Sequence, residues 1–193
     1  AAGFDIANLT NPDGILYPFD NAMFMPAGDG SMFIPRDADS IVFGQGTRND
    51  FAYDGDVVYH EFAHAVVDST CALEGATVDS QGIDIGPGAL NEGYADIFAM
   101  FLTGNSAMGE YAGEGLTPSG WIRSLENDKR CPDDLIGEVH EDSQPWAGAA
   151  WPIPRTCAAS ASSSTPCRRT PTQTSCRWGS AGISTMRSEK MRP

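Results

Sequence analysis

Short apolar runs broken by turn residues fill the first part of the chain. Between Gly14 and Gly46 the runs ILYPF, NAMFMP, SMFIP and SIVFG are separated by Gly, Pro, Asp and Asn. Such a pattern is typical of an antiparallel sheet with tight turns. We therefore predict a sheet lobe over residues 1–55.

The pattern becomes helical after this point. From Asp56 to Cys71 apolar residues occur on all sides, which predicts a largely buried helix with Asp56 as its N-cap or first-turn acid. A Gly-rich loop, QGIDIGPG, precedes a second predicted helix, ALNEGYADIFAMFLTG, which Gly104 would stop. Residues 105–139 are loop-rich, with a short helix expected in SGWIRSLEN, and a third helix is expected from SQPWAGAAW. Residues 56–151 thus form a mainly helical lobe.

The two lobes together predict one α+β domain over residues 1–151, and the chain changes directly after it. In residues 152–193, 28 of 42 residues are Ser, Thr, Arg, Pro or Cys, and Leu and Val are absent. Such a segment cannot bury enough apolar area to offset its conformational entropy, so we expect it to be disordered. A shifted reading frame would produce this change, as would a natural Ser/Thr-rich linker.

The formal net charge of −14 conceals a split between these parts. Residues 1–151 hold 25 acidic and 5 basic groups, or −20, and residues 152–193 hold 1 acidic and 7 basic groups, or +6. Because a body at −20 repels phosphate backbones, we expect no nucleic-acid partner. No apolar run approaches the length of a membrane span, about 18 residues, and we expect no membrane partner. The first residues lack the features of a signal peptide, so we expect a mature product or a fragment.

The cysteines give little support for a thiolate metal site. None of the five forms a C-x-x-C pair: Cys71, Cys131, Cys157, Cys167 and Cys176. Cys71 and Cys131, the two in the acidic body, either pair in an oxidising compartment or remain two buried thiols.

The segment DVVYHEFAHAVVD carries two of the three histidines. Residues four apart lie on one face of a helix, so His60 and His64 can direct their imidazoles at one metal ion. Glu61 is rotated by about 100° from His60, which brings its carboxylate beside such an ion, within reach of a water molecule. Tetrahedral zinc would need a third protein ligand and keep one open position. The alternative is two core histidines with incidental spacing.

The segment GALNEGYAD carries two acids four residues apart on the second predicted helix. A buried carboxylate pair is costly unless it binds something. Glu92 as the third zinc ligand, with Asp96 accepting the outer N–H of a ligand histidine, would account for both. The alternative is an exposed helix face with two solvated acids. His140, the remaining histidine, is either an ordinary polar residue or a hydrogen-bond donor to a developing oxyanion.

These two segments together resemble the paired signature of the gluzincin zinc metallopeptidases, most closely the thermolysin-like enzymes, with the fungalysins a near second. DNAMFMPAGDG is similar to the edge strand on which thermolysin-like enzymes hold substrate, and GEVHEDSQ to the segment of their transition-state histidine. The likeness runs from about Phe19 to Trp151. It implies a truncated thermolysin-like fold, with a zinc site on the central helix between the two lobes.

The resemblance also implies roles for individual residues. His60, His64 and Glu92 match the zinc ligands, Glu61 the general base and His140 the donor to the transition state.

Four further positions match parts of the site that surround the metal. Asp96 matches the carboxylate behind a ligand histidine, and Asn21 with Ala22 matches the strand that pairs with substrate. Asp56 lies where the family often binds calcium, so Ca²⁺ joins Zn²⁺ as an expected ion.

The sequence departs from the family pattern at three places. Gly75 stands where a tyrosine is expected, and Thr103 stands where a calcium-binding acid is expected. The carboxylate that supports the transition-state histidine has no clear match, although Asp133, Asp134 and Glu138 lie nearby in sequence.

We therefore expect a secreted, monomeric zinc metalloendopeptidase that hydrolyses peptide bonds in protein or peptide substrates. One rival is a catalytically inactive zinc-binding module of the same fold, because missing margins would remove the substrate groove. Another is an acidic interaction domain without zinc. An aminopeptidase ranks lower, since no motif that grips a substrate N-terminus is visible.

Overall fold

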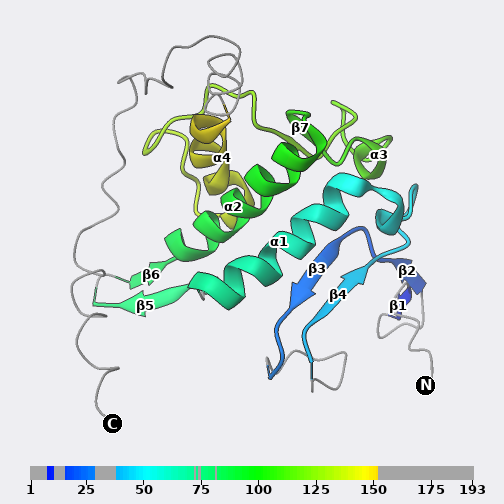
Figure 1. The fold of residues 1–193 in the computed structure, drawn as a ribbon, viewed down its shortest axis with the longest axis horizontal. Coiled ribbons are helices and arrows are strands. Elements are labelled where there is room, and N and C mark those ends of the chain that lie inside the picture. The colour runs from blue at the N-terminus through cyan, green and yellow to red at the C-terminus, as the bar shows by residue number, and fades with distance from the viewer. Residues whose placement is uncertain are drawn as a thin grey trace, which may run out of the picture.

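The computed structural model describes residues 8–10, 16–28, 38–71, 73, 75–80 and 82–151. They form a mixed arrangement of helices and small antiparallel sheets, as the α+β prediction requires at this level (Figure 1). The predicted tail, residues 152–193, and the run SMFIP lie outside the described residues.

The N-terminal strands pair two by two. The antiparallel pairs are β1 (Asn8–Thr10) with β2 (Leu16–Pro18) and β3 (Ala22–Met25) with β4 (Ser40–Phe43). The predicted antiparallel strands are therefore confirmed where the chain is described. Each pair is a two-stranded sheet, so one edge of β3 has no strand partner among the described residues.

Two long helices form the centre of the fold. α1 (Gly55–Cys71) and α2 (Gly86–Thr103) pack side by side, and α4 (Val139–Ala150) packs on α2 (Figure 1). The β3–β4 pair packs against α1. Both predicted long helices are confirmed, and so is the stop at Gly104, which ends α2 in the left-handed region at φ 73°.

An aspartate outside the predicted helix caps α1. Oδ1 of Asp54, next to the short 3-10 helix η1 (Phe51–Tyr53), accepts the N–H groups of Asp56 at 3.0 Å and Val57 at 3.3 Å. Its Oδ2 accepts the N–H of Ala112 at 2.7 Å, at the short helix α3 (Glu110–Gly113). Asp56 is thus the first-turn acid of the two roles predicted for it.

Three local predictions differ from the structure. QGIDIGPG is not simply a loop, because β6 (Gly82–Asp84) pairs with β5 (Thr77–Asp79) and the segment GPG opens α2. SGWIRSLEN forms no helix, since β8 (Arg123–Ser124) pairs there with β7 (Ala107–Met108). α4 begins four residues before its predicted start.

Tertiary hydrogen bonds explain these differences. Beside β8, the N–H of Ile122 donates to the carbonyl of Met108 at 2.9 Å, so strand pairing overrides a weak local helix preference. At α4, the side chain of Glu138 accepts the N–H of Glu141 at 2.9 Å and starts the helix early.

The apolar core lies around α2. Ala99 and Met100 on this helix are fully buried, and Leu125 and Ala147 pack into the same cluster. Asp96 is buried in the same helix at 1% exposure. The described helices include none with the length and apolar character needed to cross a membrane.

The two body cysteines match neither predicted arrangement. Cys71 is a free, exposed thiol at the end of α1, whereas Cys131 takes part in a disulfide bond. They therefore do not pair with each other, and they are not two buried thiols.

Candidate metal centre

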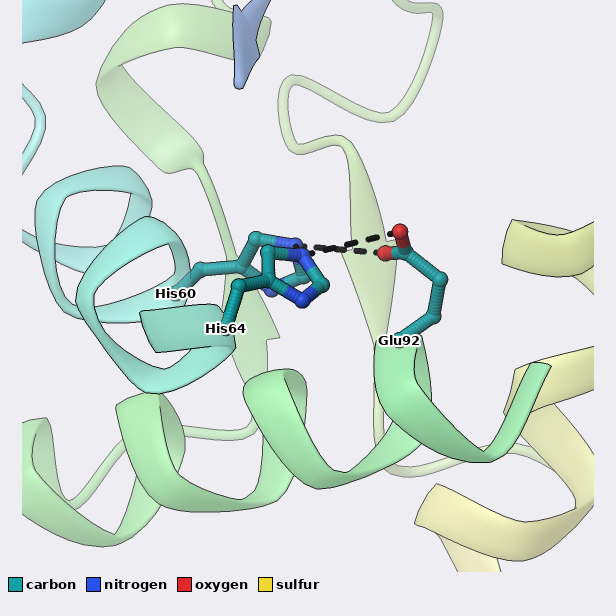
Figure 2. Close-up of side chains that lie close together, drawn as sticks. All are labelled: His60, His64 and Glu92. Carbon is teal, nitrogen blue, oxygen red and sulfur yellow. Dashed lines mark hydrogen bonds and ion pairs between the residues drawn. The ribbon is translucent and has the colours of Figure 1, made fainter. Parts of the chain in front are cut away.

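Three side chains from the two central helices converge at one point. His60 and His64 come from successive turns of α1, and Glu92 comes from α2 (Figure 2). Nε2 of His60 lies 3.0 Å from Nε2 of His64 and 3.2 Å from Oε2 of Glu92. Nε2 of His64 lies 3.5 Å from Oε1 of Glu92. Within the described ranges, no other group of three His, Cys, Asp or Glu residues has its donor atoms this close together.

These separations fit the geometry of a tetrahedral metal ion. Ligand bonds of about 2.0–2.1 Å at tetrahedral angles put neighbouring ligand atoms about 3.3 Å apart. The two Nε2 atoms lie 3.0 Å apart, and each lies near a different oxygen of the Glu92 carboxylate, at 3.2 Å for His60 and 3.5 Å for His64. Two imidazoles and one carboxylate are also a donor set that zinc accepts.

The contacts at the Nδ1 atoms of His60 and His64 favour a proton on each Nδ1. In the neutral form of each ring, Nε2 then carries no proton. The amide nitrogen of Asn91 donates to the carbonyl of Leu73 at 3.0 Å, so its Oδ1 faces Nδ1 of His64 at 2.8 Å. An amide oxygen only accepts, and Nδ1 of His64 must therefore donate. Nδ1 of His60 lies 2.8 Å from Oδ1 of Asp96, an ion-pair contact that favours a proton on this nitrogen. With both rings neutral, two lone pairs and a carboxylate would meet, an arrangement that either a proton or a metal cation stabilises.

The charges around the site favour such a cation. Burial lowers the pKa of His60, but the hydrogen bonds and charges of Asp96 and Glu92 outweigh it and raise the pKa to about 9. Burial raises the pKa of Glu92, but the hydrogen bond and charge of His60, together with the charges of His64 and His140, lower it to about 2. Burial and the neighbouring charge of His60 lower the pKa of His64. The surroundings of His60 therefore favour a positive charge at this centre.

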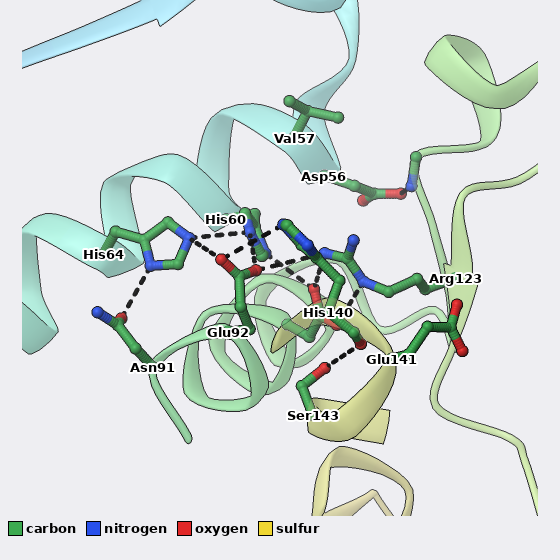
Figure 3. A network of polar contacts seen from close by, with 12 residues as sticks. Asp56, Val57, His60, His64, Asn91, Glu92, Arg123, His140, Glu141 and Ser143 are labelled. Carbon is green, nitrogen blue, oxygen red and sulfur yellow. Dashed lines mark hydrogen bonds and ion pairs between the residues drawn. The ribbon is translucent and has the colours of Figure 1, made fainter. Parts of the chain in front are cut away.

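Arg123 is a part of the site that the sequence prediction missed. From β8 it donates to Asp96 through Nε at 2.9 Å and Nη2 at 2.8 Å, and Nη2 lies 3.9 Å from Oε2 of Glu92 (Figure 3). Burial alone would raise the pKa of Asp96, but the charge of Arg123 and the hydrogen bond to His60 hold it well below its usual range. One signal was available: Arg123 is one of only 5 basic groups in residues 1–151.

Glu61 lies beside the cluster as a buried carboxylate at 5% exposure. Its Oε2 has no hydrogen-bond partner among the described residues. Burial raises its pKa, the charge of His60 opposes this, and the charge of Glu92 adds to it. A buried carboxylate with a free oxygen and a raised pKa suits a proton acceptor.

His140 approaches the centre from the first turn of α4. Its Nε2 lies 3.5 Å from Oε1 of Glu92, and its ring is 46% exposed. Nδ1 of His140 lies 2.6 Å from Oε1 of Glu138, so Glu138 is the one of the three nearby acids that contacts this histidine. Burial raises the pKa of Glu138, but the hydrogen bonds from the His140 side chain and from the backbone of Glu141 and His140 outweigh it and lower the pKa overall.

A cleft of about 700 Å³ connects the cluster with β3. Seven of the predicted site residues line it: Asn21, Ala22, His60, Glu61, His64, Glu92 and His140. Phe51, Val57 and Met108 contribute apolar side chains to the cleft lining. Gly75, at the position where the sequence comparison expected a tyrosine, also lines the cleft. Of the remaining predicted residues, Asp96 lies behind His60, away from the cleft lining.

Asp56 lies apart from this cluster. Its Oδ2 accepts the N–H of Gly109 at 3.4 Å (Figure 3). Burial and the charge of Asp54 raise its pKa. Among the described residues Asp56 is not part of any tight group of metal-ligating side chains, and calcium binding there stays a prediction.

The fold and the site define a mixed helix-and-sheet domain with a His-His-Glu cluster at the base of a cleft. No protein-family model matches the chain, and no curated protein matches it either.

Proposed function

We propose that this protein is a zinc metalloendopeptidase with a thermolysin-like arrangement, acting on protein or peptide substrates. The observation that supports it best is the convergence of the two Nε2 atoms of His60 and His64 on the carboxylate of Glu92, beside the unpartnered carboxylate oxygen of Glu61. A secreted, monomeric state with zinc as the resident ion belongs to the same proposal.

The proposal needs a metal site with an open position, because catalytic zinc keeps a corner for water or substrate. His60, His64 and Glu92 supply three corners. His140 lies near Glu92 but is not a member of that mutually close group. His60, His64 and Glu92 would hold the ion, and because all three line the cleft, water or substrate in the cleft could complete its coordination.

The residues around the cleft have separate roles in the proposed reaction. A bound zinc ion would polarise the scissile carbonyl and lower the pKa of the attacking water. Glu61 accepts the proton of that water and later delivers it to the leaving amine. His140, held by Glu138, donates a hydrogen bond to the oxyanion as it forms.

Substrate would bind as an added strand. One edge of β3 has no strand partner within the described residues, and Asn21 and Ala22, at the start of this strand, line the cleft. An extended peptide on such an edge makes main-chain hydrogen bonds, with side chains directed alternately into pockets. This arrangement accommodates a peptide of any length and favours an endopeptidase.

The second candidate is a zinc-binding interaction module without turnover. Tyr59, Phe62 and Val66 follow one another along α1 and are 42%, 58% and 37% exposed. Exposed apolar rows of this kind often mark protein–protein contacts. This candidate shares the metal centre and differs in lacking cleavage.

The deciding experiment compares zinc-loaded protein with Glu61→Gln at matched zinc content on a quenched peptide library. Cleavage that disappears in Glu61→Gln while zinc stays bound is the expected result. Zinc bound by both proteins with cleavage by neither would instead favour the interaction module.

A further inference from the structure

α1 presents a third polar side chain to the cleft. His60, His64 and Asp68 follow one another at intervals of four residues, so they lie along one face of the helix. All three line the cleft. With a rise of about 1.5 Å per residue, Asp68 lies about 6 Å further along the helix axis than His64.

The carboxylate of Asp68 is not engaged by the protein. It is exposed and makes no hydrogen bond or ion pair with any other residue that the structure describes. The two other carboxylates that line the cleft differ, because Glu92 lies against the two ligand histidines and Glu61 is buried. Asp68 is therefore the carboxylate of the cleft that can receive an incoming cation.

No basic side chain of the described cleft lining offsets this charge. Arg123 is the only Lys or Arg among the described residues that line the cleft, and Asp96 holds it on the His60 side. His60 and Asp68 are separated by about 12 Å along α1. The end of the cleft at Asp68 is thus acidic, whereas the charge of Arg123 is paired at the other end.

The same end of the cleft has room for a long side chain. Leu73 and Gly75 follow α1 directly and line the cleft with Asp68. A Cβ atom added at Gly75 would meet no atom of the described residues within 4 Å. An incoming side chain can therefore reach this end without displacing a wall residue at Gly75.

We propose that Asp68 is a specificity residue that favours a Lys or Arg side chain within two residues of the bond to be cleaved. An extended peptide advances about 3.3 Å per residue, so the 6 Å between His64 and Asp68 corresponds to about two residues. The position relative to the cleaved bond rests on the proposed function. The preference for a positive charge is a property of binding and is measurable by itself.

The test measures peptide binding without turnover. Acetylated, amidated octapeptides of Ala and Leu carry one Lys or one Gln at each position in turn, and fluorescence anisotropy reports their binding to the zinc-loaded Glu61→Gln chain. At the best position we expect the Lys peptide to bind about fivefold more tightly than the Gln peptide, the ratio expected for a partly exposed ion pair. Asp68→Asn in the same background should reduce this ratio to about one.

Asp128→Asn is the matched control, since Asp128 is exposed and does not line the cleft. It should keep the Lys preference, and raised salt should weaken that preference. Equal binding of the two peptides, a preference that survives Asp68→Asn, or no peptide binding at any position would each overturn the inference.

Cleavage by the wild-type chain separates the two proposals. A Lys preference that depends on Asp68, without any cleavage, would support the role of Asp68 and count against the peptidase. Cleavage with no charge preference would support the peptidase and overturn the role of Asp68.

Discussion

Nδ1 of His60 lies 2.8 Å from Oδ1 of Asp96, and this contact joins the metal centre to the core of the protein. Asp96 is 1% exposed and also accepts hydrogen bonds from Nε and Nη2 of Arg123. One buried carboxylate therefore contacts a candidate ligand histidine and pairs with a buried cation at the same time. A carboxylate behind a ligand histidine fixes its tautomer and increases its basicity.

Replacing this carboxylate should weaken metal binding. We expect Asp96→Asn to lower zinc affinity by about 10–100-fold, because the amide no longer enforces the tautomer of His60. Competition with a chromogenic zinc chelator measures the affinity. Asp128→Asn, with the same chemical change on the surface, should leave it unaltered; equal affinities in both variants would show that the contact with His60 does not matter for the metal.

The Arg123–Asp96 pair should matter for folding far more than a surface pair. Arg123→Ala leaves Asp96 charged and buried without its main partner, and we expect a loss of about 3–5 kcal/mol in the free energy of unfolding. Urea denaturation followed by circular dichroism measures it. Lys129→Ala removes the more exposed ion pair with Glu141 and should cost at most about 1 kcal/mol. Similar losses of unfolding free energy in the two variants would contradict the larger contribution expected of the buried Arg123–Asp96 pair.

Zinc binding should weaken as the pH falls. The pKa of His60 is raised to about 9, so below that pH the ring binds a proton that zinc must displace. Apparent affinity should drop about tenfold per pH unit between pH 8 and pH 6.5, and zinc binding should release close to one proton. Calorimetry in buffers of different ionisation enthalpy counts that proton. Constant affinity over this interval would indicate that His60 is already neutral.

Replacing His140 should lower turnover without reducing the zinc content. If His140 donates to the oxyanion, His140→Ala should lower kcat about 10²–10³-fold and leave KM and zinc content nearly unaltered. Steady-state kinetics with metal analysis tests this. Loss of zinc in this variant would instead make His140 a ligand, and unchanged kcat would remove it from the reaction.

The sequence by itself determined the features that depend on local periodicity. Residues four apart share a helix face whatever surrounds the helix, so the pairs His60 with His64 and Glu92 with Asp96 could be placed in advance. The two central helices were predicted within about three residues of their ends for the same reason, with Gly104 as the stop.

Only the tertiary structure decided which distant residues meet. Arg123 lies in a segment predicted as helix and becomes a partner of Asp96 because its strand pairs with β7. Glu138 becomes the support of His140 by capping α4, although three acids were candidates. Cys71 and Cys131 do not pair, although they are the only cysteines of the acidic body. Contacts between elements depend on how buried surfaces and charges are satisfied together, and no periodicity within one element carries that information.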